Sequence, residues 1–223
     1  PRWYDDTPTG RWDCIWALAR PEGGFWGYLT ARPWSHTPGL RCESIGMVES
    51  DDGVHWRAVA PPVIEWGDWP RMDVGEVGAI GKIGDEYYLM LGYGETGLGN
   101  RHALLPLEGR AGMYVFRADN PRGPFRADTG AYRLLTSITG TRMSYFARFH
   151  STPDGMLVNH HSISRSDVRW LAPLKRALVD GEGHLYLGYW EGNDAAKGNP
   201  IDLDLRACAC PEGVEGGWKA SRQ

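Results

Sequence analysis

Apolar and polar residues alternate along many short segments of this 223-residue chain, and glycine-rich turns separate the segments. Alternation over about four to eight positions predicts β-strands. The strands pair as hairpins: segments 76–83 and 86–93 flank a Gly84-Asp85 turn, and "DGEG" separates two further apolar runs. Gly-containing turns of this kind favour tight antiparallel connections. Helical periodicity is almost absent, so the pattern predicts an all-β fold.

The predicted strands fall into three groups of about four, at residues 11–66, 73–137 and 143–190. Each group spans roughly sixty residues or fewer, which is the scale of a four-stranded antiparallel propeller blade. Segment 54–66 is predicted as one strand, and a Gly-rich insertion at 94–112 interrupts the second group. A β-sandwich is the alternative. The same strand–turn–strand order recurs in successive groups, which favours a single β-propeller domain over 1–223.

Composition excludes several classes of partner. Hydrophobic residues make up 42% and charged residues 23% of the chain, as in ordinary globular proteins. The net charge of −4 provides no basic surface for nucleic acid or for a membrane. No apolar run approaches the ~20 residues of a membrane-spanning helix. The chain begins with Pro1 and shows no signal peptide, so its compartment is not assigned.

The four cysteines provide little chemistry on their own. Cys208 and Cys210 are too close for an easy mutual disulfide and lack the spacing of a zinc site. We interpret all four as thiols, with a Cys14–Cys42 disulfide as the alternative.

Two turn motifs resemble those of five-bladed propeller glycosidases. "SDDGVHW" (residues 50–56) and "ADNPRGPF" (118–125) are similar to turns that end outer strands in the invertase/levanase group (family 32) and the arabinanase/xylosidase group (family 43). Both turns place an aromatic residue between sheets, so they indicate architecture rather than chemistry. The resemblance covers about four-fifths of the chain. It implies a five-bladed propeller that is incomplete here, because no counterpart of the N-terminal blade is found.

The same resemblance assigns two acidic residues. "EVGAIGKIGDEYYLML" is similar to the segment that opens with the general acid of these enzymes, which implies this role for Glu76, although Val77, Gly78 and Ala79 replace the usual Cys-Pro-Asp. "RWDCIWALARP" resembles the strand opened by an Arg-Asp-Pro motif, whose Asp stabilises the transition state. This implies Asp13 for that role.

A nucleophilic or basic Asp is expected on the absent blade, and Asp5 and Asp6 are poor substitutes for it. The alternative for Glu76 is a solvated residue paired with Arg71 or Lys82.

Glycoside hydrolysis requires these groups to meet. A carboxylic acid protonates the leaving oxygen, and a carboxylate about 5–5.5 Å away (retention) or about 6.5–9.5 Å away (inversion) attacks the sugar or activates water. The inner strands of a propeller converge on one axis, so distant hairpins can supply both groups. Apolar surroundings raise the pKa of a Glu towards that of a general acid.

Several other residues are candidates for substrate binding. Arg148 lies in the first strand of the third group. A buried arginine there is expected to pair with a carboxylate of the site or of an acidic substrate; a structural ion pair is the alternative. His160 and His161 point to opposite faces of a regular strand, so one of them at most can reach the funnel; a packing histidine is the alternative. Tryptophans at strand ends can stack on sugars. The predicted binding residues are Asp73, Arg148, His160, Trp16, Trp66, Trp69 and Trp190.

Three functional hypotheses follow. The first is a glycoside hydrolase with paired carboxylates in an axial funnel. The second is a non-catalytic carbohydrate-binding or interaction propeller, and the third is a sialidase or glycoside phosphorylase on the same fold. In each case the partner is a carbohydrate. No cofactor is required, and a structural calcium ion is allowed.

Overall fold

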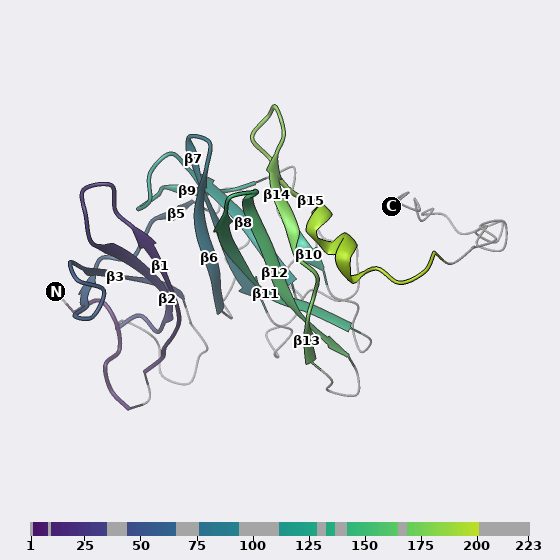
Figure 1. The fold of residues 1–223 in the computed structure, drawn as a ribbon. Coiled ribbons are helices and arrows are strands. Elements are labelled where there is room, and N and C mark those ends of the chain that lie inside the picture. The colour runs from purple at the N-terminus through teal and green to yellow at the C-terminus, as the bar shows by residue number, and fades with distance from the viewer. Residues whose placement is uncertain are drawn as a thin grey trace, which may run out of the picture. The chain divides into compact units, whose positions relative to one another are not determined.

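The computed structural model describes residues 2–8, 10–34, 44–65, 76–93, 112–128, 133–136, 142–164 and 169–200 (Figure 1). The chain divides into two compact units, residues 1–190 and 191–223. All fifteen described strands belong to the first unit. In the second unit the structure describes one short 3-10 helix, η1 (Glu191–Ala196). None of the helices described is long and apolar enough to cross a membrane.

The first sheet is antiparallel and four-stranded, in the order β1-β2-β3-β4. Its strands are β1 (Trp12–Ala19), β2 (Phe25–Ala31), β3 (Ser44–Ser50) and β4 (Arg57–Val59). Each strand pairs with the next along the chain, so β1 and β4 lie at the two edges. This is the order expected of a propeller blade.

The second sheet has the order β5-β9-β8-β7-β6, with β10 also paired to β8. Its strands are β5 (Ile64–Glu65), β6 (Glu76–Ile83), β7 (Glu86–Tyr93), β8 (Gly112–Ala118), β9 (Phe125–Ala127) and β10 (Arg133–Thr136). The prediction of one strand over 54–66 is wrong, because β4 belongs to the first sheet and β5 pairs in parallel with β9. Pro61 and Pro62 lie between them and have no N–H to donate to a ladder.

The third sheet has the order β11-β12-β14-β15, with β13 also paired to β12. Its strands are β11 (Arg142–Thr152), β12 (Gly155–Ser164), β13 (Arg169–Leu171), β14 (Lys175–Val179) and β15 (Leu185–Tyr189). β13 and β14 follow one another along the same edge of β12, and Pro173 lies in the gap between them. Each of the three sheets therefore has a long strand, β1, β6 or β11, at one edge.

The hydrophobic core lies on both faces of the second sheet. Leu89 and Leu91 belong to a cluster that includes Tyr28 and Met47 of the first sheet. Met90, between them, belongs instead to a cluster that includes residues of the third sheet, such as Phe149 and Val158. The alternation of β7 thus buries both of its faces, and each fully buried large side chain contributes about 1.5–3 kcal/mol.

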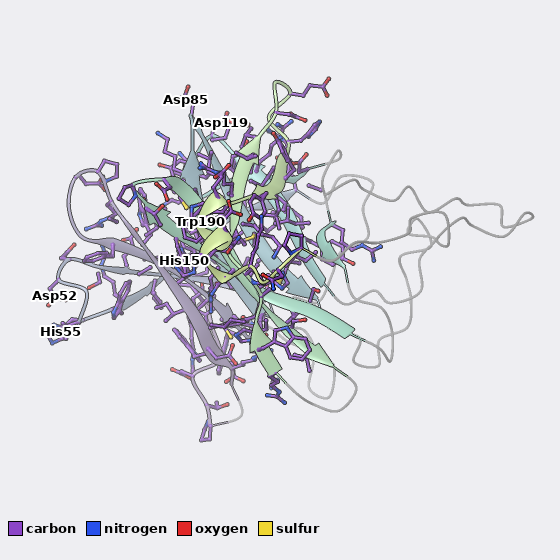
Figure 2. The ribbon with its side chains drawn as sticks, turned by 45° about the vertical axis from the view of Figure 1, so that its right-hand side comes forward. Asp52, His55, Asp85, Asp119, His150 and Trp190 are labelled. Carbon is purple, nitrogen blue, oxygen red and sulfur yellow. The ribbon has the colours of Figure 1, made fainter. Side chains whose placement is uncertain are left out.

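The β6–β7 hairpin closes on the Gly84-Asp85 turn that the sequence predicts. Ile83 pairs with Glu86, so the loop has two residues, and Gly84 takes a φ of 62° at the first of them. A positive φ at this position is typical of a type II′ turn and favours glycine. Figure 2 shows Asp85 at the same end of the molecule as Asp119, which follows β8. Glu76 begins β6 and so lies at the opposite end of the hairpin.

The second turn motif, residues 118–125, joins the first and second sheets. Phe125 is fully buried in the cluster that contains Tyr28, which confirms an aromatic residue between sheets at this turn. The Tyr28 hydroxyl donates a hydrogen bond to Pro121 O (2.8 Å). Trp56 packs instead on the other face of the first sheet, against the cluster that includes Tyr4 and Val48.

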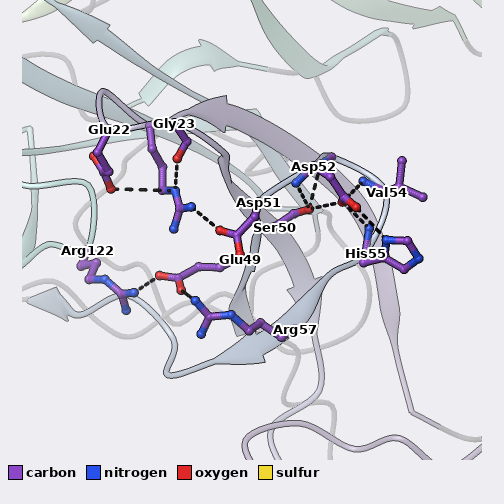
Figure 3. Close-up of polar contacts among 12 residues, drawn as sticks. Glu22, Gly23, Glu49, Ser50, Asp51, Asp52, Val54, His55, Arg57 and Arg122 are labelled. Atoms are coloured by element: carbon purple, nitrogen blue, oxygen red, sulfur yellow. Dashed lines mark hydrogen bonds and ion pairs between the residues drawn. The ribbon is translucent and has the colours of Figure 1, made fainter.

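The carboxylate of Glu49 on β3 lies between two arginines (Figure 3). One is Arg57 of β4 (2.7 Å) and the other is Arg122 from the turn between β8 and β9. The Glu49 side chain is only 7% exposed. This cluster therefore links the second turn motif to the first sheet.

Candidate active site

Three edge strands, β1, β6 and β11, form the frame of the candidate site. Both β1 and β11 pack against β6. Each has a break in its ladder: between Asp13 and Trp16, between Val77 and Ala79, and between Tyr145 and Arg148. Such bulges re-aim side chains and are frequent next to active sites.

Two of these bulges contain a strained residue. Cys14 has a φ of 56° and Phe146 a φ of 57°, in the left-handed region that non-glycine residues rarely adopt. Backbone strain of this kind costs of order 1–3 kcal/mol and tends to occur at functional sites. Both strained residues flank the side chains that surround Glu76.

Glu76 is the first residue of β6, and its side chain is 31% exposed. Its Oε1 lies 3.8 Å from Nη2 of Arg11, and the Tyr145 hydroxyl and the Cys14 thiol hydrogen-bond to its carboxylate. Lys82 is one of the two alternative partners named from the sequence, but its Nζ lies over the Tyr87 ring, 5.7 Å from the centroid. The other offered partner, Arg71, lies outside the described residues.

The surroundings of Glu76 favour its protonated form. Burial raises the pKa of Glu76 above its ordinary value, and the nearby Asp13 charge raises it as well. The Arg11 and Arg148 charges and the Cys14 hydrogen bond act in the opposite direction, but burial dominates. A carboxyl group that keeps its proton above the usual range of a Glu is suited to donate it.

Asp13 reaches the site through Arg11. Nε of Arg11 lies 2.7 Å from Oδ2 of Asp13, and the Asp13 side chain is 45% exposed. Arg11 therefore bridges the two predicted catalytic acids. In the sequence Arg11 stands out only as part of a motif, because its position between the two carboxylates depends on the packing of β1 against β6.

The Cys14 thiol stays protonated beside these acids. Burial, followed by the charges of Glu76 and Asp13, raises the pKa of Cys14 to about 12. Cys14 is a free thiol in the structure. It therefore acts as a neutral hydrogen-bond donor between the two carboxylates rather than as a nucleophile.

Arg148 of β11 lies beside Val77 and close to the rings of Phe146 and Trp16. Nη1 of Arg148 donates a hydrogen bond to Val77 O (3.3 Å), and its Cζ lies 4.0 Å from the Phe146 ring centroid and 5.4 Å from that of Trp16. Burial lowers the pKa of Arg148. The indole N–H of Trp16 donates to Ile80 O (2.7 Å), so this ring is fixed between β1 and β6.

The structure places the other predicted binding residues away from Glu76 or outside the described residues. His160 is buried, with Nδ1 3.0 Å from His161 O and Nε2 3.2 Å from Lys175 Nζ, so both ring nitrogens are engaged inside the third sheet. Trp190, labelled in Figure 2, donates a hydrogen bond from its indole N–H to Asp154 Oδ2 (3.0 Å) at the β11–β12 turn. Asp73, Trp66 and Trp69 lie outside the described residues.

Asp5 and Asp6 have structural contacts. Asp5 is buried and accepts hydrogen bonds from the backbone N–H and the hydroxyl of Thr7, and Asp6 pairs with Arg2. Within the described ranges, no group of three or more His, Cys, Asp or Glu side chains could hold a metal ion.

Comparison with solved structures supports the propeller architecture. The chain matches an α-L-arabinanase of Cellvibrio cellulosa complexed with arabinohexaose (TM-score 0.53, 15% identity, 79% of this chain and 57% of that one). It also matches a xylan β-1,4-xylosidase of Bacillus halodurans C-125 (TM-score 0.56, 15% identity, 85% and 34%) and a thermostable family-43 glycoside hydrolase (TM-score 0.53, 14% identity, 82% and 59%). No protein-family profile and no curated protein sequence matches.

The chain shares its fold with family-43 glycoside hydrolases. The match confirms the predicted all-β propeller class built from four-stranded antiparallel sheets. The chain spans between 57% and 61% of the Cellvibrio arabinanases that it matches, so it corresponds to part of that propeller. At this level of identity the likeness establishes the fold alone.

Proposed function

We propose that this protein is a glycosidase whose general acid is Glu76. The supporting observation is the position of this carboxyl group, half-buried at the start of β6 where β1 and β11 pack on the same strand. The raised pKa of Glu76 favours its protonated form, which holds the proton that a leaving oxygen needs. The fold of the family-43 enzymes supports the same reaction class by analogy.

The surrounding residues have separable roles in this proposal. Glu76 donates its proton to the glycosidic oxygen, and the negative charge of Asp13 stabilises the positive charge that develops on the sugar. Arg11 orients Asp13 through the 2.7 Å contact. Its positive charge also lowers the pKa of Glu76, which opposes the effect of burial. The carboxylate that attacks the sugar or activates water is left unassigned.

Replacement of Glu76 tests the proposal. Glu76→Gln keeps the shape of the side chain and removes the acidic proton, so turnover of chromogenic glycosides should fall about 10²–10⁴-fold. Oligosaccharide binding and the melting temperature should remain close to those of the parent. Glu65→Gln is the matched control, because Glu65 is exposed and pairs only at the surface with Arg126. Unchanged turnover in the Glu76 variant would contradict the proposal.

A non-catalytic carbohydrate-binding propeller is the second candidate. The close Arg11–Asp13 contact favours it, because a carboxylate already paired with a guanidinium offers less charge to a transition state. Calorimetry against arabino- and xylo-oligosaccharides, combined with analysis of released sugar after long incubation, separates the two. Binding with no released sugar supports the second candidate and contradicts the first.

A further inference from the structure

Arg148 is a half-buried cation that makes few polar contacts with the described residues. Among the described residues its one hydrogen bond is the 3.3 Å contact from Nη1 to Val77 O, and no described carboxylate forms an ion pair with it. A guanidinium has five N–H donors, so most of its donor capacity is unused within the described part of the chain. Burial of a charge without a partner is costly, which is why burial lowers the pKa of this group.

The aromatic rings beside Arg148 hold its guanidinium in place. Phe146 lies 4.0 Å from Cζ and Trp16 lies 5.4 Å from it. Trp16 is fixed by its hydrogen bond to Ile80 O, and Phe146 is held in the β11 bulge with its ring 5.1 Å from that of His161. A guanidinium held in this way loses little freedom when it binds a planar anion.

When Glu76 is protonated, the charged groups around it carry more positive than negative charge. In that state the charged groups that act on Glu76 are the two arginines Arg11 and Arg148 and the single carboxylate of Asp13. Arg11 is already paired with Asp13 at 2.7 Å. Arg148 has no such ion pair among the described residues. The Glu76 carboxylate acts on Arg148 only when it is charged, so an anion complements Arg148 when Glu76 is protonated.

If the proposed function holds, we infer that Arg148 binds an anionic group of the substrate, either the carboxylate of a uronic acid residue or a phosphate. Both anions present oxygens that a guanidinium can bind in a bidentate manner. Binding of either one next to Glu76 would also favour the protonated form of that acid. The substrate class is then an acidic carbohydrate rather than a neutral pentoside.

A binding titration tests this inference without any need for turnover. Methyl glucuronide and methyl xyloside of the same anomeric form differ only in the carboxylate at C5, and tryptophan fluorescence can follow their binding. At low salt we expect the glucuronide to bind at least about tenfold more tightly, since hydrogen bonds between charged groups are among the strongest. Inorganic phosphate is the second arm. If phosphate displaces the probe and the glucuronide does not bind better than the xyloside, the anion is a phosphate.

Variants of Arg148 test whether this residue causes the preference for the anionic ligand. Arg148→Gln should remove the preference for the anion, Arg148→Lys should keep part of it, and the exposed control Arg126→Gln should keep all of it. Equal affinity of the parent chain for charged and neutral ligands, together with no phosphate binding, would overturn the inference even if Arg148→Gln failed to fold. A preference that survives in Arg148→Gln would overturn it too. Loss of turnover in Glu76→Gln tests the proposed function separately.

Discussion

The hydroxyl of Tyr145 reaches Glu76 across a position where only glycine leaves room. Gly92 on β7 is the ladder partner of Glu76, and a Cβ at that position would lie 2.6 Å from the Tyr145 oxygen. The Tyr145 side chain is buried, and burial followed by the charge of Glu76 raises its pKa. Tyr145 therefore stays a neutral donor to the Glu76 carboxylate, and Gly92 is a condition for that contact.

Gly92→Ala should displace Tyr145 from Glu76. Overpacking of this kind costs about 1–3 kcal/mol in the free energy of unfolding, and turnover should fall with the loss of the hydrogen bond. Denaturant unfolding and glycoside kinetics measure the two effects. Gly181→Ala is the control, because nothing lies within 4 Å of a Cβ there. A Gly92→Ala variant as stable and as active as that control would disprove the steric argument.

If Glu76 is the proposed general acid, Arg11 should set the pH range in which it acts. A general acid works in its protonated form, so kcat/KM should fall as the pH rises through the raised pKa of Glu76. The Arg11 charge lowers that pKa, so Arg11→Gln should move the basic limb of the pH–rate profile to higher pH. Lys82→Gln, at the far end of β6, should leave the limb in place. A limb that shifts to lower pH in the Arg11 variant would refute this electrostatic role.

At the scale of the elements, ionic clusters join neighbouring sheets. Glu49 of β3 holds Arg57 of its own sheet and Arg122 of the β8–β9 turn (Figure 3). Glu49 is buried, while the two arginines are 64% and 46% exposed. Solvent can therefore rehydrate the arginines when the carboxylate is removed, which moderates the cost.

Glu49→Gln should accordingly reduce the free energy of unfolding by about 1–2 kcal/mol. Urea unfolding of the parent and the variant measures this difference. The control is Glu65→Gln, where both partners of the Arg126 pair are exposed and the expected change is about 0–1 kcal/mol. Equal losses in the two variants would show that burial of Glu49 adds nothing to its contribution.

At the scale of the whole molecule, His184 should make stability depend on pH. Nδ1 of His184 pairs with the fully buried Asp128, which follows β9, so the β14–β15 turn is joined to the second sheet. The hydrogen bond to Asp128 raises the pKa of His184; the charges of Asp128 and Asp180 add to this, while burial and Arg117 oppose it. Glu182 also contacts the ring, at Nε2 (3.3 Å).

Because the folded pKa of His184 exceeds the unfolded value, its stabilising effect is complete below about pH 6.5 and is lost as the pH rises through the folded pKa. The difference in melting temperature between the parent and His184→Gln should therefore be largest near pH 6 and should shrink at alkaline pH. Thermal melts from pH 5.5 to 9 measure it. A difference that stays constant over this range would exclude protonation of His184 as the cause.

The sequence predicts the molecule better than it predicts the site. Alternation and Gly-containing turns were enough to predict the β6–β7 hairpin and to place Glu76 at its mouth, because both are local effects. The sheet membership of β5 was missed, since it depends on pairing with a strand some sixty residues away. The sequence does not predict the three side chains around Glu76, those of Arg11, Cys14 and Tyr145. Bulges in β1 and β11 shift the register of these strands and so change which side chains point towards Glu76.

The Gly84-Asp85 turn has a practical consequence. It lies eight residues along the strand from Glu76, about 26 Å at the usual rise of a strand, and a Cβ at Gly84 would meet nothing within 4 Å. Exposed tips of this kind tolerate inserted peptides. A fluorophore or an immobilisation tag grafted there would report on the protein, or tether it to a biosensor surface, while the Glu76 end of the same hairpin stays unmodified.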